Sequence, residues 1–354
     1  MTRLILGQRL ILAALALTVG ACGDAHPAAD GGPGPDARRV DARSDGAGGS
    51  DAPPDTRPGP DAVQVQCPSD PAPCAGTCNA KGYCEIDRGF GPEVRIAPST
   101  VVLGDPAFPG EVEHLERVSR QYLIDRHEVT ARQYKRCMDA GGCSMPTNSG
   151  PGICTVAVLD DPMWLAWIRQ HGLEGDHPAN CMTWPDALAF CRWRGARLPT
   201  EAEWVLAARG AGGLSAGSCE SAADLATTGR CNRKRYPWGD TLESDRMNSG
   251  VGSAPWTNES TTPVGFFDGS RHNGTQTSFQ TGDDSSAFGA RDLQGNLREW
   301  VSDERAVPGD ATMRGRVLKG DAFQTSETVL AAGFVTPPGE SSQILGFRCA
   351  RDAP

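Results

Sequence analysis

The sequence is poor in the features that mark common enzyme and nucleic-acid-binding classes. Aromatic residues make up only 6% of its 354 residues, and its six histidines are scattered. It contains neither a paired-histidine metal motif nor a G-x-S-x-G nucleophile turn. The net charge is −10 without a basic cluster, which argues against nucleic acid or an anionic membrane surface as the partner. The 43 glycines and 27 prolines instead suggest one loop-rich domain with additional flexible sequence.

Long apolar runs are also missing, apart from one at the N-terminus. Arg3 and Arg9 precede an apolar run over residues 10–19, which is too short to span a bilayer as a helix. The pattern predicts an export signal over residues 1–22. Its last four residues, VGAC, resemble a bacterial lipobox and imply cleavage before Cys22 and acylation of that cysteine. An ordinary signal peptide with an incidental Cys22 is the alternative, and both place the mature protein outside the cytoplasm.

Residues 23–64 contain almost no large apolar side chain. Such a segment cannot bury enough surface to offset the entropy lost on ordering, so the composition predicts a disordered tether. A binding tail is the alternative, but spacing a domain from its membrane anchor in the periplasm or at the cell surface is sufficient.

The twelve cysteines after Cys22 are an even number, which suits disulfides in an oxidising compartment. The first four lack a C-x-x-C pair, so residues 65–90 predict a small two-disulfide stub of open connectivity rather than a zinc site. These four are Cys67, Cys74, Cys78 and Cys84. Proximity in the chain suggests three further pairs, namely Cys137 with Cys143, Cys154 with Cys181, and Cys219 with Cys231.

The most informative stretch is CMTWPDALAFCRWRGARLPTEAEWVLAARG. In it Thr183 precedes Asp186 by three residues, and Thr200 precedes Glu203 by three. Both pairs fit the capping box, so the stretch predicts two short helices. Helical spacing predicts that the first helix buries a stripe formed by Trp184, Ala187, Leu188 and Cys191.

An earlier helix is expected where Thr130 and Gln133 form another capping pair, after the strand-like segment VRIAPSTVVLG. His127 lies just before this helix, beside Asp125 and Glu128. It is a candidate metal ligand, but a structural role in a strand-to-helix turn is the preferred interpretation.

The capping stretch also opens an ordered series of motifs. RLPTEAEW and AARG are followed by YPWG, GNLREWVSD, RVLKG and GFRCAR. Over residues from about 91 to 352 this series resembles the formylglycine-generating enzyme, or sulfatase-modifying factor, family. The resemblance implies a domain over residues 91–354 with an α+β fold of low regular secondary structure, related to C-type lectin-like folds. In such a fold calcium and disulfides substitute for a large continuous core.

The resemblance further implies roles for particular residues. It pairs Cys191 with Cys349, and it places a calcium loop at Asp292, Gly295, Leu297 and Glu299. Carboxylate and carbonyl oxygens are the hard ligands that calcium prefers, although an ordinary turn with solvated acids is the alternative. Only Asn248 matches the family's second calcium site, so that site is not expected.

The catalytic cysteines of the family have no counterpart in this chain. In the family two cysteines after the RVLKG-like strand bind copper(I) as thiolates, and oxygen converts a substrate cysteine to formylglycine. Here those positions fall on Thr325 and Leu330, a preceding serine position falls on Ala322, and Arg298 replaces a tryptophan. Copper is therefore not expected.

These observations predict a lipid-anchored, non-catalytic domain that binds an extended peptide or a glycan in the inherited cleft. A divergent formylglycine-generating oxidase acting on a protein cysteine is the first alternative. A structural surface protein with an empty cleft is the second.

Overall fold

The computed structural model of the protein describes residues 64–105, 111–146, 152–211, 219–227, 229–252, 260–307, 310–325, 330 and 333–353. The expected export signal over residues 1–22 lies outside the described residues, as does the expected tether up to residue 63. All described residues belong to one compact unit, Ser50–Pro354.

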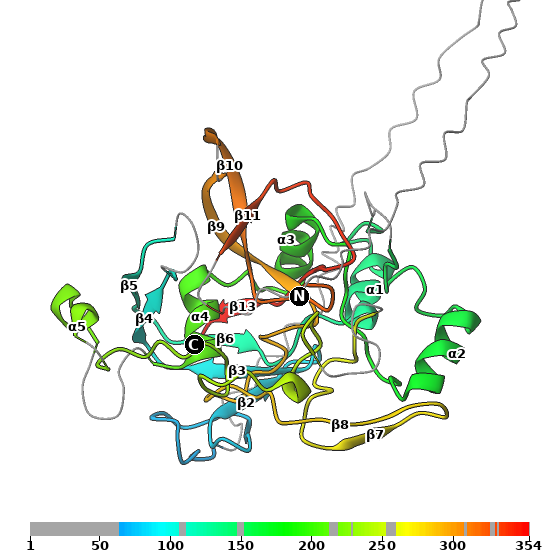
Figure 1. The fold of residues 1–354 in the computed structure, drawn as a ribbon, viewed down its shortest axis with the longest axis horizontal. Helices are drawn as coiled ribbons and strands as arrows, with labels where there is room; N and C mark the ends of the chain where they lie inside the picture. The colour runs from blue at the N-terminus through cyan, green and yellow to red at the C-terminus, as the bar shows by residue number, and fades with distance from the viewer. Residues whose placement is uncertain are drawn as a thin grey trace, which may run out of the picture. The chain divides into compact units, whose positions relative to one another are not determined.

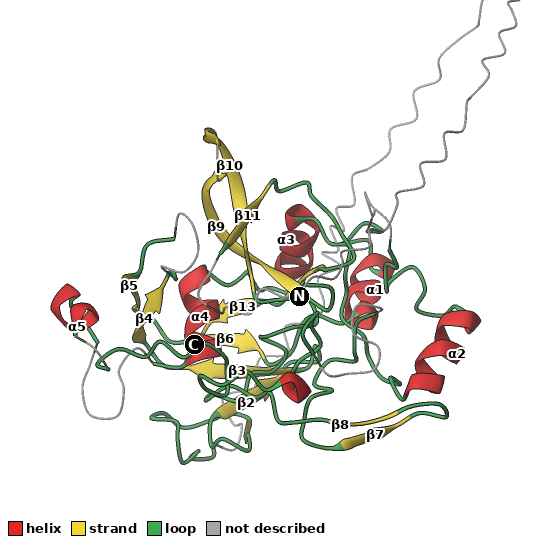
Figure 2. Ribbon diagram, viewed as in Figure 1, coloured by secondary structure: helices red, strands yellow, loops and turns green. Residues whose placement is uncertain are grey.

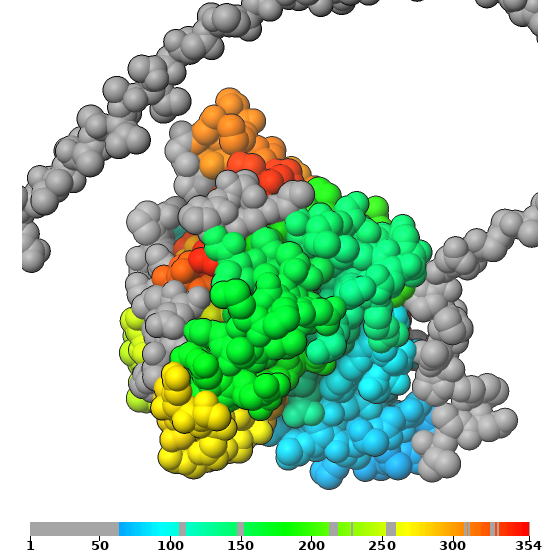
Figure 3. Space-filling model, turned by 90° about the vertical axis from the view of Figure 1, so that its right-hand side faces the viewer, coloured from blue at the N-terminus to red at the C-terminus, as the bar shows by residue number. Residues whose placement is uncertain are grey.

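A five-stranded antiparallel sheet joins the two ends of this unit (Figure 1). Its strand order is β1 (Thr77–Cys78), β2 (Cys84–Asp87), β3 (Pro92–Ile96), β6 (Tyr122–Asp125) and β13 (Ala350–Asp352). The first two strands come from the cysteine-rich stub. The stub is also tied to β3 by a buried ion pair of 2.8 Å between Arg95 and Asp70. It therefore extends the sheet of the main domain, and Figure 3 shows the blue stub surface continuous with the green one.

A second sheet has the order β11 (Phe334–Thr336), β10 (Asp310–Lys319), β9 (Arg298–Val307) and β12 (Leu345–Phe347). Only β12 and β9 pair in parallel in this sheet. In Figure 1 the ends of β9 and β10 project from the domain as a long orange hairpin. Two further hairpins pair β4 (Ser99–Leu103) with β5 (His114–Val118), and β7 (Arg271–Asn273) with β8 (Ser278–Gln280).

The helices are short, and Figure 2 shows them joined to the strands by long loops. They are α1 (Ala131–Asp139), α2 (Pro162–His171), α3 (Trp184–Trp193), α4 (Glu201–Arg209), α5 (Ala222–Ala226) and the 3-10 turn η1 (Ser244–Arg246). Capping boxes at Thr130, Thr183 and Thr200 start α1, α3 and α4, as predicted. Three elements were not predicted from the sequence, namely α2, α5 and the hairpin of β7 and β8. α2 is an apolar segment that buries Trp164 and Ile168, whereas α5 and the hairpin lie in loop-like sequence.

The core consists mainly of two apolar clusters. One surrounds α4, whose nine residues are all buried, and the other lies between α1, α3 and the C-terminal strands. On α3 the predicted stripe is correct for Ala187 and Cys191, while Trp184 and Leu188 are only half-buried. Phe190 is fully buried instead, because the second cluster lies on the side of the helix that Phe190 and Cys191 share.

All twelve cysteines of the described residues form disulfides. The pairs expected from the sequence are present, namely 137–143, 154–181, 191–349 and 219–231. In the stub the connectivity is Cys67–Cys78 and Cys74–Cys84. Six disulfides indicate an oxidising compartment. Within the part of the chain that the structure describes, no helix has the length and apolar character that crossing a bilayer requires.

Candidate functional site

The turn that follows β10 contains Thr325, on which the first of the two family cysteine positions is expected to fall, and Leu330 is the expected second position. The Thr325 hydroxyl accepts a hydrogen bond from the Ala322 N–H (3.0 Å) and donates one to the Asp321 carboxylate. The Thr325 N–H donates to the Ala322 carbonyl (2.9 Å), which closes the turn. Its hydroxyl is therefore used within the turn itself. Leu330 is fully buried in the apolar cluster around α4.

Three loops meet at this turn. The Gly250 N–H donates to the Thr325 carbonyl (2.6 Å), and the Gln343 side chain donates to that of Gln324 (2.8 Å). The other end of the Gln343 amide accepts from the Ile153 N–H (3.2 Å). Ile153 and Val251 are 46% and 37% exposed. The surface around the turn thus combines amide groups with exposed apolar side chains.

Arg298, which replaces the tryptophan expected in this family, lies at the start of β9. Its guanidinium carbon lies 3.8 Å from the ring centroid of Phe334 on β11. This is a cation–π distance, so the substituted side chain packs against the edge strand of the second sheet.

The expected calcium loop lies in a buried, carboxylate-rich region. Glu299 and Arg348 are both fully buried and form a two-pronged ion pair, with distances of 2.6 Å and 2.7 Å. The Trp204 indole N–H also donates to Glu299 (2.8 Å). Both carboxylate oxygens of Glu299 are therefore already engaged by protein groups.

The other expected ligands lie in a tight turn. Asp292 has a φ of 56°, and its carboxylate accepts from the Gly265 N–H (2.7 Å). Gly295 has a φ of 88°, and a Cβ added there would lie 2.6 Å from the Asn248 carbonyl oxygen. Any side chain at position 295 would clash with this carbonyl, so glycine is what allows the Asn248 backbone to lie against the loop. Sequence reasoning had set Asn248 aside.

Two buried side-chain oxygens at this loop have no hydrogen-bond partner among the described residues, Oδ1 of Asn248 and Oε1 of Gln294, and Nε2 of Gln294 has none either. A buried acceptor without a partner is costly, so both would gain from a cation or a water. Hard oxygen donors of this kind fit calcium. No metal-like group of three or more His, Cys, Asp or Glu side chains occurs among the described residues, so a calcium ion here would depend on backbone and amide oxygens.

Burial shifts the pKa values of three carboxyls around this loop. Burial raises the pKa of Asp284 to about 8, and the neighbouring Asp292 adds to this shift. Burial likewise raises the pKa of Asp292 to about 6. The pKa of Glu128 is held well above its ordinary value by burial and then by Asp292 and Glu299. The charged forms of these three carboxyls are therefore disfavoured, although Arg291 and Arg348 offset part of the shift.

His127 lies close to this loop but has a packing role. A Cβ added to Gly265 would lie 2.8 Å from its Nε2, so the ring is pressed against that backbone. Burial, and then the charges of Arg126 and Arg348, hold the pKa of His127 well below its usual value. The ring is therefore neutral, in agreement with the structural interpretation of this residue.

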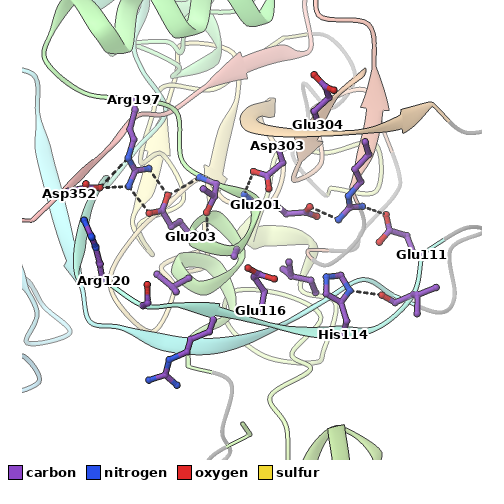
Figure 4. Close-up of a pocket in the computed structure, with 18 residues that line it drawn as sticks. Glu111, His114, Glu116, Arg120, Arg197, Glu201, Glu203, Asp303, Glu304 and Asp352 are labelled. Atoms are coloured by element: carbon purple, nitrogen blue, oxygen red, sulfur yellow. Dashed lines mark hydrogen bonds and ion pairs between the residues drawn. The ribbon is translucent and has the colours of Figure 1, made fainter. Parts of the chain in front are cut away.

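A cavity of about 620 Å³ lies elsewhere, between β5, the start of α4 and β9 (Figure 4). Neither Thr325 nor Leu330 lines it. No sequence pattern marks this cavity, because its lining comes from five separate stretches of the chain.

Comparisons with solved structures return chains of low similarity. CarF has a TM-score of 0.46 at 19% identity, covering 74% of this chain and 98% of that chain. PvdO from Pseudomonas aeruginosa has a TM-score of 0.45 at 19% identity, covering 74% and 95%.

Similarity to named proteins is clearer in sequence. The formylglycine-generating enzyme of Streptomyces coelicolor is 31% identical over 337 residues, covering 80% of this chain and 96% of that protein. The formylglycine-generating enzyme of Thermomonospora curvata is 29% identical over 319 residues, covering 76% and 95%. An inactive C-alpha-formylglycine-generating enzyme 2 from Bos taurus is 32% identical over 185 residues, covering 50% and 51%.

This chain therefore covers the Streptomyces coelicolor and Thermomonospora curvata enzymes along nearly their whole length. The observed fold is α+β with few helices, as the resemblance implied. The sequence model of the sulfatase-modifying factor enzyme 1-like domain (FGE-sulfatase) matches residues 91–353, and the chain belongs to this family.

Proposed function

We propose that this protein is a non-catalytic, ligand-binding member of its family, held outside the cytoplasm by a lipid anchor. The observation that carries the proposal is the replacement of the two family cysteines by Thr325 and Leu330. A hydroxyl and an isobutyl group cannot form the thiolate pair that binds copper(I). The Bos taurus relative is described by its name as inactive, which supports the proposal that a member of this family can lack catalysis.

The environments of the two residues support this proposal. The Thr325 hydroxyl is engaged by Asp321 and Ala322, and the Leu330 side chain fills the core around α4. Every cysteine of the described residues is in a disulfide, so none supplies a replacement thiolate. The substitutions thus stabilise the turn and the core in place of a redox site.

The ligand we propose is an extended peptide or a glycan bound at the surface around Thr325. Amide side chains such as Gln324 and Gln343 donate and accept hydrogen bonds with either class, and the exposed Ile153 and Val251 offer apolar contact. Peptide and glycan arrays probed with the purified chain separate the two classes. Absence of binding to both would favour the structural alternative.

The purified protein should leave a sulfatase-type cysteine peptide unchanged in mass when incubated with copper and oxygen. The variant Thr325→Cys with Leu330→Cys should gain copper(I) binding, measured by competition with a chromophoric chelator, because it restores two soft ligands. Thr325→Ser with Leu330→Ala is the matched control, since it makes similar losses of volume without thiols. If the unaltered protein forms formylglycine, the proposal is wrong and the oxidase alternative is correct.

Calcium is proposed as a structural ion of the loop. Asp292 would hold the ion through its carboxylate, and Gly295 and Leu297 through their backbone carbonyls. Glu299 is ion-paired with Arg348 and would stabilise the loop without contacting the ion. A ligand that binds only the folded state adds about 2.7 kcal/mol of stability at a free concentration of 100 times Kd. Chelation should therefore lower the melting temperature.

The calcium prediction is checked by melting curves with and without chelator. Asp292→Asn should reduce the chelator response, and Glu299→Gln should lower the melting temperature and weaken that response. Asp139→Asn is the control, because this carboxylate is exposed on α1 and forms an ion pair with Lys135. If the parent protein ignores chelator, calcium does not stabilise this loop.

Acylation at Cys22, which lies outside the described residues, is the remaining part of the proposal. Full-length protein produced in a bacterium should incorporate labelled palmitate. Cys22→Ala should lose the label, and equal labelling of this variant would refute the lipid anchor.

A further inference from the structure

The disulfide between Cys154 and Cys181 lies at the edge of the surface proposed above to bind a ligand. Ile153, whose exposed side chain belongs to that surface, directly precedes Cys154, and its N–H donates to the Gln343 side chain (3.2 Å). The Cys181 N–H donates to the carbonyl of Ser342, the neighbour of Gln343 (3.1 Å). The disulfide therefore connects two segments that both bond to the chain at or next to Gln343.

Asn180, which is only 2% exposed, joins the same segments from within. Its side-chain nitrogen donates to the Ile153 carbonyl (2.9 Å) and to the Gln343 carbonyl (2.8 Å). Its side-chain oxygen accepts from the Thr155 N–H (2.7 Å). Because both groups of the amide are engaged in this way, the position of the Asn180 backbone decides how Ile153 and Gln343 lie relative to each other.

The backbone at Cys181, directly after Asn180, is in an uncommon conformation. Among the described residues other than glycine, only Cys181, Asp292 and Asn296 have a left-handed φ, of 61°, 56° and 63°. Asparagine and aspartate adopt this region readily, because their short polar side chains can hydrogen-bond locally, whereas cysteine lacks this advantage. A residue stays in such a conformation only where the surrounding structure imposes it, and such residues are frequent in switch regions. The covalent bond to Cys154 is one of the constraints on Cys181.

One end of this disulfide is accessible to a reductant, because Cys154 is half-buried while Cys181 is fully buried. Three of the six disulfides are instead buried at both ends, namely 74–84, 191–349 and 219–231. The other two, 67–78 and 137–143, are accessible at one end but contain no cysteine with a left-handed φ. Accessible or strained disulfides are the ones most readily reduced, and Cys154–Cys181 has both properties.

We propose that Cys154–Cys181 is a redox-sensitive switch at the ligand surface, opened by a dithiol reductant outside the cytoplasm. Its consequence for ligand binding rests on the function proposed above. A thiolate of the reductant attacks the accessible Cys154, and Cys181 leaves as a thiolate. The second thiol of the reductant then displaces Cys154. In total the protein disulfide takes up two electrons and two protons to give two thiols, and the dithiol is oxidised to a disulfide.

Opening the disulfide alters the ligand surface through the backbone. Without the cross-link Cys181 relaxes to a negative φ, and this rotation displaces Asn180, which precedes it in the chain. The bonds from the Asn180 side chain to Ile153 and Thr155 are then lost, and the segment separates from Gln343. Only the oxidised protein therefore presents Ile153 and Gln343 in one fixed arrangement, so reduction weakens ligand binding.

A redox titration of the full chain tests the switch. The protein is equilibrated in mixtures of reduced and oxidised dithiothreitol, and free thiols are blocked with N-ethylmaleimide and assigned by peptide mass spectrometry. We expect Cys154 and Cys181 to be labelled at a ratio of reduced to oxidised dithiothreitol about tenfold lower than Cys137 and Cys143 require. For a two-electron couple this is about 30 mV. Cys137–Cys143 is the matched control, since it also pairs one buried with one half-buried cysteine.

Hydrogen exchange separates movement of the segment from reduction alone. In the reduced protein the N–H groups of Ile153 and Thr155 should exchange at least about tenfold faster, while those of α4 keep their rates. The variant Cys154→Ser with Cys181→Ser should show the same fast exchange without reductant. The variant Cys137→Ser with Cys143→Ser should leave the exchange of Ile153 and Thr155 unchanged.

Peptide and glycan arrays probed with the oxidised and the reduced protein measure the consequence for binding. Loss of the array signals on reduction of Cys154–Cys181 supports the switch. Absence of signal in both states contradicts the proposed ligand binding, and labelling and exchange then decide the switch. The inference is overturned if this disulfide needs as much reductant as Cys137–Cys143, if Ile153 exchanges equally in both states, or if array binding survives reduction unchanged.

Discussion

Removing the Cys191–Cys349 disulfide by replacing both cysteines with alanine should lower the free energy of unfolding by about 5 kcal/mol. The bond closes a loop with a sequence separation of 158, and the chain-entropy relation gives about 5 kcal/mol for a loop of this length. Denaturant unfolding under two-state conditions measures the loss. The effect is large because total stabilities of single domains are only about 5–15 kcal/mol.

The position of this bond adds to its effect. Both cysteines are fully buried. The Cys349 carbonyl accepts a hydrogen bond from the Asp125 N–H on β6, and the Cys349 N–H donates to the Asp125 carboxylate. The disulfide therefore joins α3 to the end of the five-stranded sheet. The matched control is removal of Cys137–Cys143, whose separation of 6 predicts only about 2 kcal/mol. Equal losses from the two pairs would show that loop length does not decide their contribution.

Arg348→Met should destabilise the protein by about 3–5 kcal/mol, because it leaves buried carboxylates without their cation. Arg348 is fully buried and bonds to Glu299 through two nitrogens. It also donates to the backbone carbonyls of Arg291 and Asp292. Methionine keeps much of the volume but supplies none of these donors. Urea unfolding at a fixed calcium concentration measures the change.

A double variant separates charge from packing in this experiment. Arg348→Met combined with Glu299→Gln removes both charges of the pair, so it should be more stable than Arg348→Met alone. Arg314→Met, which breaks an exposed pair with Glu304, is the control and should cost at most about 1 kcal/mol. If the double variant is less stable than the single one, the buried charge is not the cause.

The single and double variants of Arg348 also concern the proposed calcium loop. Glu299 matches the family pattern by its place in the motif, but its carboxylate is engaged by Arg348 and Trp204. Within the described part of the chain, Asn248 and Gln294 keep side-chain oxygens without a partner at this loop, and neither residue belongs to the set expected from the motif. A motif match shows which residues are present, whereas their partners depend on segments far away in the chain.

The sequence alone determined the features whose causes are local. The capping boxes at Thr130, Thr183 and Thr200 each need groups only three residues apart, so their helices start where expected. The predicted loss of the catalytic thiols is equally local, because it rests only on the residue types at positions 325 and 330, and it stays a prediction.

Only the tertiary structure decided the features that join distant parts of the chain. The stub becomes part of the main sheet because β2 pairs with β3, and Phe190 is buried because the second core cluster lies on its side of α3. Glu116 and Asp303 line one cavity although 187 residues of sequence separate them. Spacing along the chain cannot show such neighbours, because backbone pairing and burial of apolar surface between remote segments bring them together.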